Sequence, residues 1–219
     1  MRYFVKTPKT VRWFTRMLWK VNTQEKRVYL TFDDGPVPEV TPEVLQILKK
    51  YNVKATFFCV GDNLRKHPEV FADIIADGHC VGNHSFNHLN GWLTGIKNYY
   101  KNSIKTQAYI RSLYRNNHQK PPKVQLFRPP YGKINILQLL TVRLRYKIVS
   151  WTTITYDYDK TVSPEECLNN ATATLCPGAI VVFHDSIKAH HNMSYALPRF
   201  IEYCHNEGYE FGTLDEAFA

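Results

Sequence analysis

The sequence lacks several features that would place it in a common class. No apolar run reaches the length of a transmembrane helix, and the first residues lack the uninterrupted apolar stretch of a signal peptide. A cytoplasmic location is therefore favoured over association with the cell envelope. No G-x-G-x-x-G follows the first predicted strand, which argues against a dinucleotide-binding sheet. No linker, repeat or low-complexity segment divides the 219 residues, so one domain is expected.

Paired cysteine motifs are also absent. The five cysteines form no C-x-x-C pair, so neither a zinc knuckle nor a redox motif is indicated. Cys59 and Cys80 stand inside apolar, strand-like runs, where a thiol acts as a small buried hydrophobe. This pattern favours a reducing compartment.

The charge balance is basic, with a formal net charge of +9 and a pI near 9.3. Such a balance suits nucleic acid, an anionic membrane or an acidic polymer as a neighbour. No nucleic-acid recognition motif is present, however, and the basic residues are dispersed, with the densest groups at 6–20 and 97–115. We interpret the charge mainly as a solvated surface and expect no nucleic-acid partner.

The first 25 residues are rich in basic and aromatic side chains. If this segment is helical, Phe14, Met17, Leu18 and Val21 share one face, which suits either a membrane surface or packing on the protein. Packing is favoured over weak peripheral membrane contact. Residues 1–25 are thus predicted to be an extension packed on a domain of residues 26–219.

From Arg27 onwards, short β-rich runs alternate with helical stretches. Val28 to Phe32 reads as the first strand, and Thr41 to Tyr51 follows as a helix with Thr41 as its N-cap. About seven such strands alternate with helices, which predicts an α/β fold with parallel strands. A barrel of seven or eight strands and an open doubly wound sheet both fit this pattern.

Polar residues gather where the predicted strands end. The clusters are Asp33-Asp34, "NHSFNH", "FRPPYG", "WTTITYDYD" and "FHDS". In parallel α/β folds the active site lies at the carboxyl ends of the strands, so these clusters are predicted to converge on one pocket. The adjacent carboxylates of Asp33 and Asp34 have two interpretations: an Asp-Gly turn that closes a strand, or two acids with different tasks.

His84 and His88 are four residues apart. If they begin a helix, their rings lie on one face, and this spacing suits two imidazoles on one metal ion. A carboxylate such as Asp34 would complete a site of two histidines and one carboxylate. In the alternative interpretation, both histidines cap a helix and cover the core.

The five clusters together resemble a known family. "TFDDGP", "HSFNH", "RPPYG", "WTTITYDY" and "VVFHD", in this order, resemble the motifs of polysaccharide deacetylases, the family-4 carbohydrate esterases that share the NodB homology domain. The resemblance covers about Lys26 to the C-terminus. It implies a distorted (β/α) barrel and a metal-dependent catalytic domain that removes acetyl groups, usually from N-acetylated amino sugars.

The resemblance also implies roles for individual residues. Asp34, His84 and His88 match the metal ligands, and zinc is favoured over cobalt, nickel or manganese. Asp33 matches the general base, and Arg128 matches the arginine that pairs with it. The ion would polarise the acetyl carbonyl and lower the pKa of the attacking water to roughly 7.

The remaining motifs supply the other groups. Tyr131 matches the residue whose backbone N–H helps to hold the oxyanion, His184 the general acid, and Asp157 the acid that orients its neighbours, directly on His184 or through Arg128. Asp185 is expected to organise its loop. The acetyl pocket is expected to be walled by Trp151, Val181 and Pro130.

The fourth motif departs from the family pattern, because Tyr158 stands where a tryptophan is common. The departure bears on substrate preference more than on the chemistry. The expected substrate is an N-acetylglucosamine-containing poly- or oligosaccharide, chitin-like or peptidoglycan. The alternatives are an O-acetyl esterase acting on xylan and a catalytically silent glycan-binding domain. Trp92 and Tyr99 are interpreted either as sugar-stacking side chains or as core residues.

Overall fold

The structure, a computed structural model, describes residues 17–218. Its eight strands are β1 (Arg27–Asp33), β2 (Thr56–Cys59), β3 (Cys80–Asn83), β4 (Leu126–Phe127), β5 (Lys147–Ile148), β6 (Thr153–Ile154), β7 (Ile180–His184) and β8 (Glu210–Phe211). Its α-helices are α2 (Thr41–Lys50), α3 (Gly61–Lys66), α4 (Pro68–Ala76), α5 (Ile96–Asn116), α6 (Ile136–Val142), α7 (Pro164–Thr172) and α8 (His190–Asn206). Three short 3₁₀ helices are η1 (Gly91–Leu93), η2 (Pro130–Gly132) and η3 (Glu216–Phe218).

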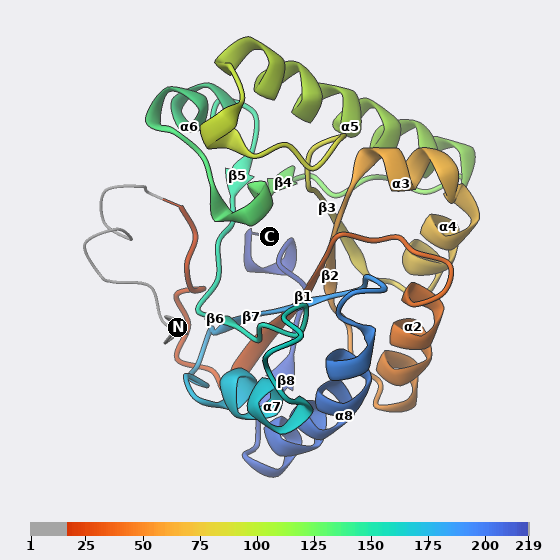
Figure 1. The fold of residues 1–219 in the computed structure, drawn as a ribbon. Helices are drawn as coiled ribbons and strands as arrows, with labels where there is room; N and C mark the ends of the chain where they lie inside the picture. The colour runs from red at the N-terminus through yellow and green to blue at the C-terminus, as the bar shows by residue number, and fades with distance from the viewer. Residues whose placement is uncertain (1–16, 219) are drawn as a thin grey trace.

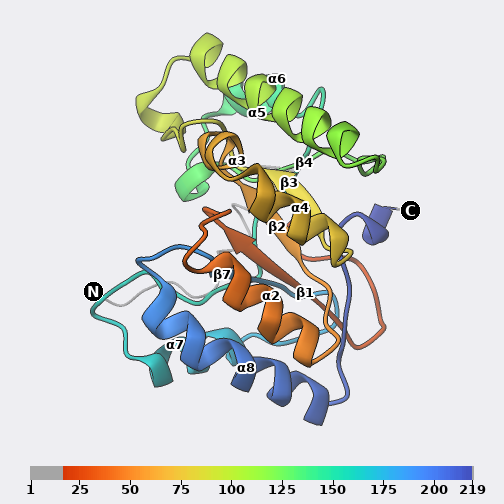
Figure 2. The ribbon, with the colours of Figure 1, turned by 90° about the vertical axis from the view of Figure 1, so that its right-hand side faces the viewer.

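The strands form one curved sheet in the order β5-β4-β3-β2-β1-β7-β6, with β8 beside β1. Each of these strand pairs is parallel. The helices lie around the outside of the sheet (Figures 1 and 2). Within residues 17–218, β5 and β6 do not pair with each other, so the seven strands form an open barrel. The expected α/β barrel of about seven parallel strands is confirmed.

The central strand β1 shows how side chains are divided between the two faces of the sheet. Successive side chains of a strand point to opposite faces. Leu30 and Phe32 face outward and pack in the large core cluster beneath the helices, whereas Tyr29 faces inward and packs with Phe58 and other barrel residues. The same alternation turns the side chain of Asp33 into the barrel, where it is 4% exposed.

The gap between β5 and β6 is bridged by the segment before β1. Leu18 donates its N–H to the carbonyl of Ile148 and accepts from the N–H of Ser150, both at 2.8 Å. Val21 then donates to the carbonyl of Gly178 at 2.9 Å, and the hydroxyl of Thr152 donates to the carbonyl of Trp19 at 2.7 Å. Residues 18–21 thus supply backbone partners to both sides of the opening.

Two local expectations are wrong. Met17 to Val21 is extended rather than helical, because its backbone groups bond to strands; Phe14 lies outside the described residues. Thr41 begins helix α2 instead of capping it, because its hydroxyl donates to the Asp185 carboxylate at 2.7 Å. The domain boundary at residue 26 stays a prediction.

The expected burial of Cys59 and Cys80 is confirmed. Ser163 caps α7 through a reciprocal capping box with Glu166. All five cysteines are free thiols, and four of them are buried. Tyr99 is buried in the core, whereas Trp92 is largely exposed. None of the described helices combines the length and apolar character needed to cross a membrane.

The close contact between the bridging segment and Gly178 can be tested by substitution. This residue has φ +79°, and a Cβ atom there would lie 2.0 Å from the carbonyl oxygen of Val21. We expect Gly178→Ala to lower the free energy of unfolding by about 2–4 kcal/mol. The new methyl group would push the Val21 carbonyl away, and alanine would also be strained in the left-handed conformation. Urea denaturation measures this change.

Gly95→Ala is the matched control, because a Cβ atom at Gly95 would meet nothing within 4 Å. We expect a loss of about 1 kcal/mol or less, as for an ordinary N-cap glycine. Equal losses in the two variants would show that the segment is not closely held against the barrel.

Candidate active site

The two acids at the end of β1 have different surroundings. Asp33 lies inside the barrel and forms an ion pair with Arg128, whose Nη1 is 2.6 Å from its Oδ1. Asp34 follows with φ +82°, a left-handed conformation that turns its side chain away from the strand alternation. The adjacent carboxylates therefore have different nearest partners, Arg128 for Asp33 and His88 for Asp34, while His84 Nε2 lies within 4 Å of both.

Arg128 is fully buried and held from several directions. Its Nη1 also donates to the hydroxyl of Thr31 at 2.8 Å, and its Nη2 donates to the carbonyl of Ser150 at 2.9 Å. The guanidinium carbon lies 4.1 Å from the centre of the Phe58 ring. A buried guanidinium fixed in this way gives the Asp33 carboxylate a rigid counter-charge.

His84 and His88 approach each other through a loop, not a helix. Ser85 (φ +60°) and His88 (φ +51°) adopt left-handed conformations in the loop after β3, so the expectation of a helical pair is wrong. The side-chain oxygen of Asn102 accepts the N–H groups of Phe86 at 2.6 Å and Asn87 at 2.9 Å. The two imidazole rings end 5.0 Å apart between centroids.

Asp34, His84 and His88 form a group that fits a divalent metal ion. One donor atom from each lies within 4.8 Å of the others, and the Asp34 Oδ1 is 3.1 Å from His88 Nε2 and 3.7 Å from His84 Nε2. His84 Nδ1 is 2.8 Å from the carbonyl of Arg128, which fixes the proton on that nitrogen and leaves Nε2 as the donor.

The protonation states of His84 and Asp34 agree with metal binding. Burial lowers the pKa of His84 to about 4, so its imidazole is neutral at pH 7. Burial alone would raise the pKa of Asp34, but the hydrogen bond from His88 and the surrounding histidines hold it well below its usual range. Neutral imidazole and ionised carboxylate are the forms that ligate metals.

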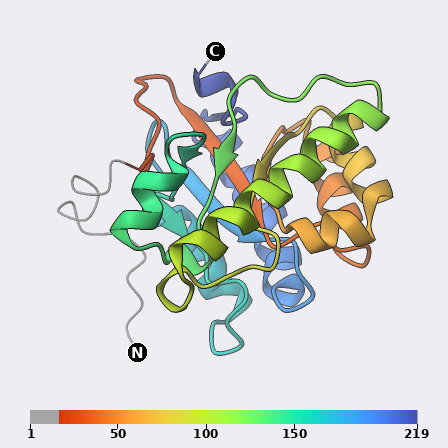
Figure 3. The same ribbon diagram turned by 90° about the horizontal axis from the view of Figure 1, so that it is seen from above.

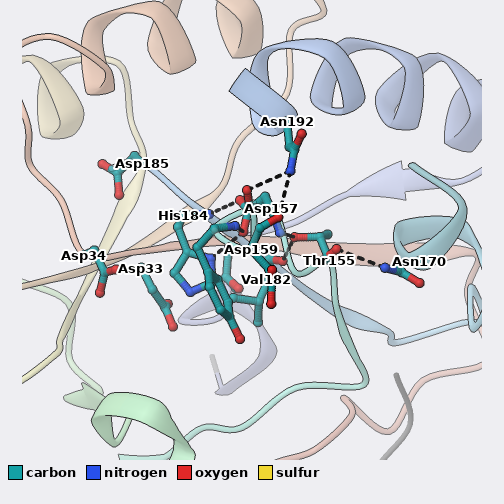
Figure 4. A network of polar contacts seen from close by, with 12 residues as sticks. Asp33, Asp34, Thr155, Asp157, Asp159, Asn170, Val182, His184, Asp185 and Asn192 are labelled. Carbon is teal, nitrogen blue, oxygen red and sulfur yellow. Dashed lines mark hydrogen bonds and ion pairs between the residues drawn. The ribbon is translucent and has the colours of Figure 1, made fainter. Parts of the chain in front are cut away.

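His184 lies beside Asp33 because β7 pairs with β1 in a register that matches these two residues. The Asp157 carboxylate accepts from the His184 backbone N–H at 2.6 Å and contacts His184 Nδ1 at 2.7 Å (Figure 4). Asp157 thus contacts His184 directly. Asn192 donates to the carbonyl of Asp157 at 3.1 Å and fixes this loop from helix α8.

The carboxylate changes the acidity of the histidine. Burial alone would lower the pKa of His184, but Asp157, with Asp34 and Asp33 beyond it, raises the pKa to about 9. His184 is therefore an imidazolium at neutral pH and can give up a proton from the nitrogen that Asp157 does not contact.

Asp33, Asp34, His84, His88 and His184 line one cavity of about 680 Å³. Its apolar and aromatic wall is made by Pro129, Tyr131, Trp151, Ile154, Tyr156 and Tyr158. Tyr131 has φ +59°, and its ring lies 4.4 Å from the ring of His88. Among the described residues, no acceptor bonds the backbone N–H of Tyr131, so this donor remains available to a ligand.

Two residues expected in the pocket wall lie elsewhere. Val181 is fully buried in the core beneath the helices, because it precedes His184 by an odd number of residues and so faces the other side of β7. Pro130 is buried, and its neighbour Pro129 lines the cavity instead. Trp151 lines the cavity as expected.

Asp185 has a larger structural part than its sequence suggests. Its carboxylate accepts from the N–H of Gly35 at 2.9 Å and from the hydroxyl of Thr41, and it is 1% exposed. A Cβ atom at Gly35 would lie 1.9 Å from this carboxylate. Asp185 thus fixes the turn that follows Asp34. Its position next to His184 was the only sequence signal for this contact.

The chain belongs to the polysaccharide deacetylase family: the family model described as "Polysaccharide deacetylase" matches residues 20–146. It is 37% identical over 194 residues to a peptidoglycan-N-acetylglucosamine deacetylase of Bacillus cereus, covering 87% of this chain and 68% of the relative. It is 33% identical to the peptidoglycan-N-acetylglucosamine deacetylase PgdA of Listeria monocytogenes, covering 88% of this chain and 39% of that protein.

The fold agrees with solved structures of the family. A crystal structure of a peptidoglycan N-acetylglucosamine deacetylase in complex with 4-naphthalen-1-yl-N-oxidanyl-benzamide superposes with a TM-score of 0.84 at 32% identity. The match covers 96% of each chain.

The His184–Asp157 contact can be tested by titration. In metal-free protein, we expect NMR of the His184 imidazole to give a pKa near 9. Asp157→Asn removes the negative charge that offsets the effect of burial on the His184 pKa, so this pKa should fall by at least one pH unit. Glu165→Gln, at the exposed start of α7, is the control and should leave His184 unchanged. An unchanged pKa in Asp157→Asn would contradict the assigned contact.

Proposed function

We propose that this chain hydrolyses the N-acetyl group of N-acetylglucosamine units in a peptidoglycan-type glycan and releases acetate. One observation carries the proposal: a base–arginine pair, a histidine–carboxylate pair and an Asp-His-His group converge on one cavity. Amide hydrolysis needs a base to activate water, a stabilised oxyanion and an acid for the leaving amine. The cavity offers a candidate for each.

Asp34, His84 and His88 would hold one divalent cation, and zinc suits a site of two imidazoles and one carboxylate. Cobalt, nickel and manganese are the other candidates, since geometry and availability as well as affinity decide which metal is bound. The bound ion supplies Lewis-acid polarisation of the acetyl carbonyl and acidifies water in the site.

Asp33 acts as the general base. Arg128 pairs with its carboxylate and orients it, so an oxygen of Asp33 can take a proton as water attacks the acetyl carbon. The carbonyl becomes a tetrahedral oxyanion in this step, and the N–H of Tyr131 is the backbone donor that would meet it. Such a donor typically contributes about 3–4 kcal/mol to the transition state.

His184 acts as the general acid. Its imidazolium gives a proton to the sugar nitrogen as the C–N bond breaks, which yields a free amine and acetate. Asp157 holds the ring in place and favours its charged form before the transfer. The edge-on Tyr158 ring, 4.8 Å from the His184 ring, limits water around the transferred proton.

The choice of peptidoglycan is supported by the relatives and by the rim of the cavity. Lys133 and Lys188 line the cavity, and no carboxylate among the described residues forms a salt bridge with either. Peptidoglycan carries free carboxylates on its stem peptides, which these lysines would attract. Chitin is uncharged, so these lysines would not attract it.

Acetate release tests the proposal directly. We expect acetate and free amine from peptidoglycan fragments, and smaller amounts from chitin oligomers. A chelator should abolish the release of both products, and added zinc should restore it. Acetate from acetylated xylan without any amine product would instead identify an O-acetyl esterase. Glycan binding without turnover by metal-loaded protein would identify a silent binding domain.

Asp33→Asn tests the role of the general base independently of metal binding. The amide cannot accept the proton, so kcat should fall by roughly 10²–10⁴ while metal content stays that of the wild type. Asp34→Asn is the matched variant one residue away, and it should lose the metal. Metal analysis and single-substrate kinetics measure both. Metal loss in Asp33→Asn, with the fold intact by circular dichroism, would show that the two aspartates have been assigned in reverse.

A further inference from the structure

Exposed hydrophobic side chains gather on one part of the surface. Of the ten large hydrophobic residues exposed among the described residues, seven lie in η1, at the start of α5, or along α6 and the turn after it. They are Trp92, Leu93, Ile96, Ile136, Leu137, Leu140 and Leu144. Leu93 is 85% exposed, Leu144 83% and Trp92 66%. A contiguous exposed apolar patch on a soluble domain usually marks an interaction site.

The two segments form one continuous surface. The Gln138 side chain of α6 donates to the carbonyls of Gly91 at 2.8 Å and Thr94 at 2.7 Å, on either side of Trp92 and Leu93. Lys133 Nζ lies 5.2 Å from the centre of the Trp92 ring. Seen from above, α5 and α6 lie on the face turned toward the viewer (Figure 3). We call the seven residues, with Lys97, Lys133, Arg143 and Arg145, the α5–α6 face.

This surface is also strongly basic. No Asp or Glu occurs between Asp77 and Asp157, whereas twelve Lys and Arg do. The rest of the chain has 16 basic and 19 acidic residues, so the positive charge of the protein is concentrated in this stretch. Lys97 follows Ile96, and Arg143 and Arg145 flank Leu144, all three exposed.

The combination of charges and apolar side chains limits what can cover the face. A second copy of the chain would bring two basic surfaces together, which repel. Residues 1–16 contain five Lys or Arg and no acid, so their charge does not complement the face either. A soluble polyanion would satisfy the charges but leave the leucines and Trp92 in water.

An anionic bilayer satisfies both requirements, because its surface attracts Lys and Arg and its interface takes up Trp and Leu side chains. We propose that the α5–α6 face docks on the surface of an anionic lipid bilayer. Trp92, Leu93 and Leu144 enter the headgroup region, and Lys97, Arg143 and Arg145 contact lipid phosphates. Lys133 joins this face to the rim of the cavity, so docking places the cavity opening next to the bilayer.

Vesicle sedimentation of the full chain tests this proposal. We expect binding to vesicles of equal parts phosphatidylglycerol and phosphatidylcholine, and little binding to phosphatidylcholine alone. Arg143→Gln/Arg145→Gln should weaken binding roughly 30-fold, the usual effect of two basic side chains at an anionic surface. Leu93→Ser/Leu144→Ser should weaken it more than tenfold, because it removes the apolar contribution.

Matched controls lie elsewhere on the surface. Lys49→Gln/Lys50→Gln removes two exposed charges from the end of α2, and Tyr203→Ser removes an exposed hydrophobic side chain from α8. Both should bind vesicles as the wild type does. Acetate release from a soluble glycan should be unchanged in all four variants, which separates this proposal from the proposed catalytic function.

Three outcomes would overturn the proposal. The first is no sedimentation with anionic vesicles. The second is normal vesicle binding by Leu93→Ser/Leu144→Ser while Arg143→Gln/Arg145→Gln fails to bind, which would show that the face binds anionic groups by charge alone and that no side chain enters the bilayer. The third is a dimer in analytical ultracentrifugation that Leu93→Ser/Leu144→Ser dissociates, which would identify an interface between two copies.

Discussion

The buried ion pair between Asp33 and Arg128 is the contact on which the rest of the site depends. An ionised carboxylate inside a barrel is unfavourable unless a fixed opposite charge and hydrogen bonds compensate its lost hydration. Arg128 provides that charge, and Thr31, Ser150 and Phe58 hold the guanidinium in place. The carbonyl of Arg128 also orients His84. One residue therefore positions the proposed base and one proposed metal ligand.

The parallel sheet explains why residues far apart in sequence meet. Asp33 and His184 end neighbouring strands in matching register, and the loop after β3 brings His84 to the same end of the sheet. Polar side chains at this end face a cavity rather than the apolar core. Backbone strain is concentrated there too, since Asp34, Ser85, His88, Tyr131 and Tyr156 all have positive φ. Such conformations persist where surrounding contacts hold them in place, which is typical of functional sites.

The sequence was sufficient for the order of the elements and for the convergence of the polar clusters, because both follow from the alternation of strands and helices. It was insufficient where the outcome depends on tertiary contacts. Spacing suggested a helix for His84 and His88, but side-chain bonds from Asn102 stabilise a loop. Val181 was expected in the pocket wall, but it stands three residues before His184, and an odd spacing in a strand places it on the opposite face. Nothing local in the sequence indicated that Leu18 would pair with β5.

That pairing has a consequence for how the protein can be shortened. The peptide groups of Ile148, Ser150 and Gly178 at the opening of the barrel bond to residues 18–21. A chain that began at residue 26 would leave these groups without backbone partners and would expose two strand edges side by side. Unprotected edges of this kind recruit strands from other molecules. Residues 18–21 thus cover these edges and protect the barrel against self-association, although no side chain of these four residues lines the cavity.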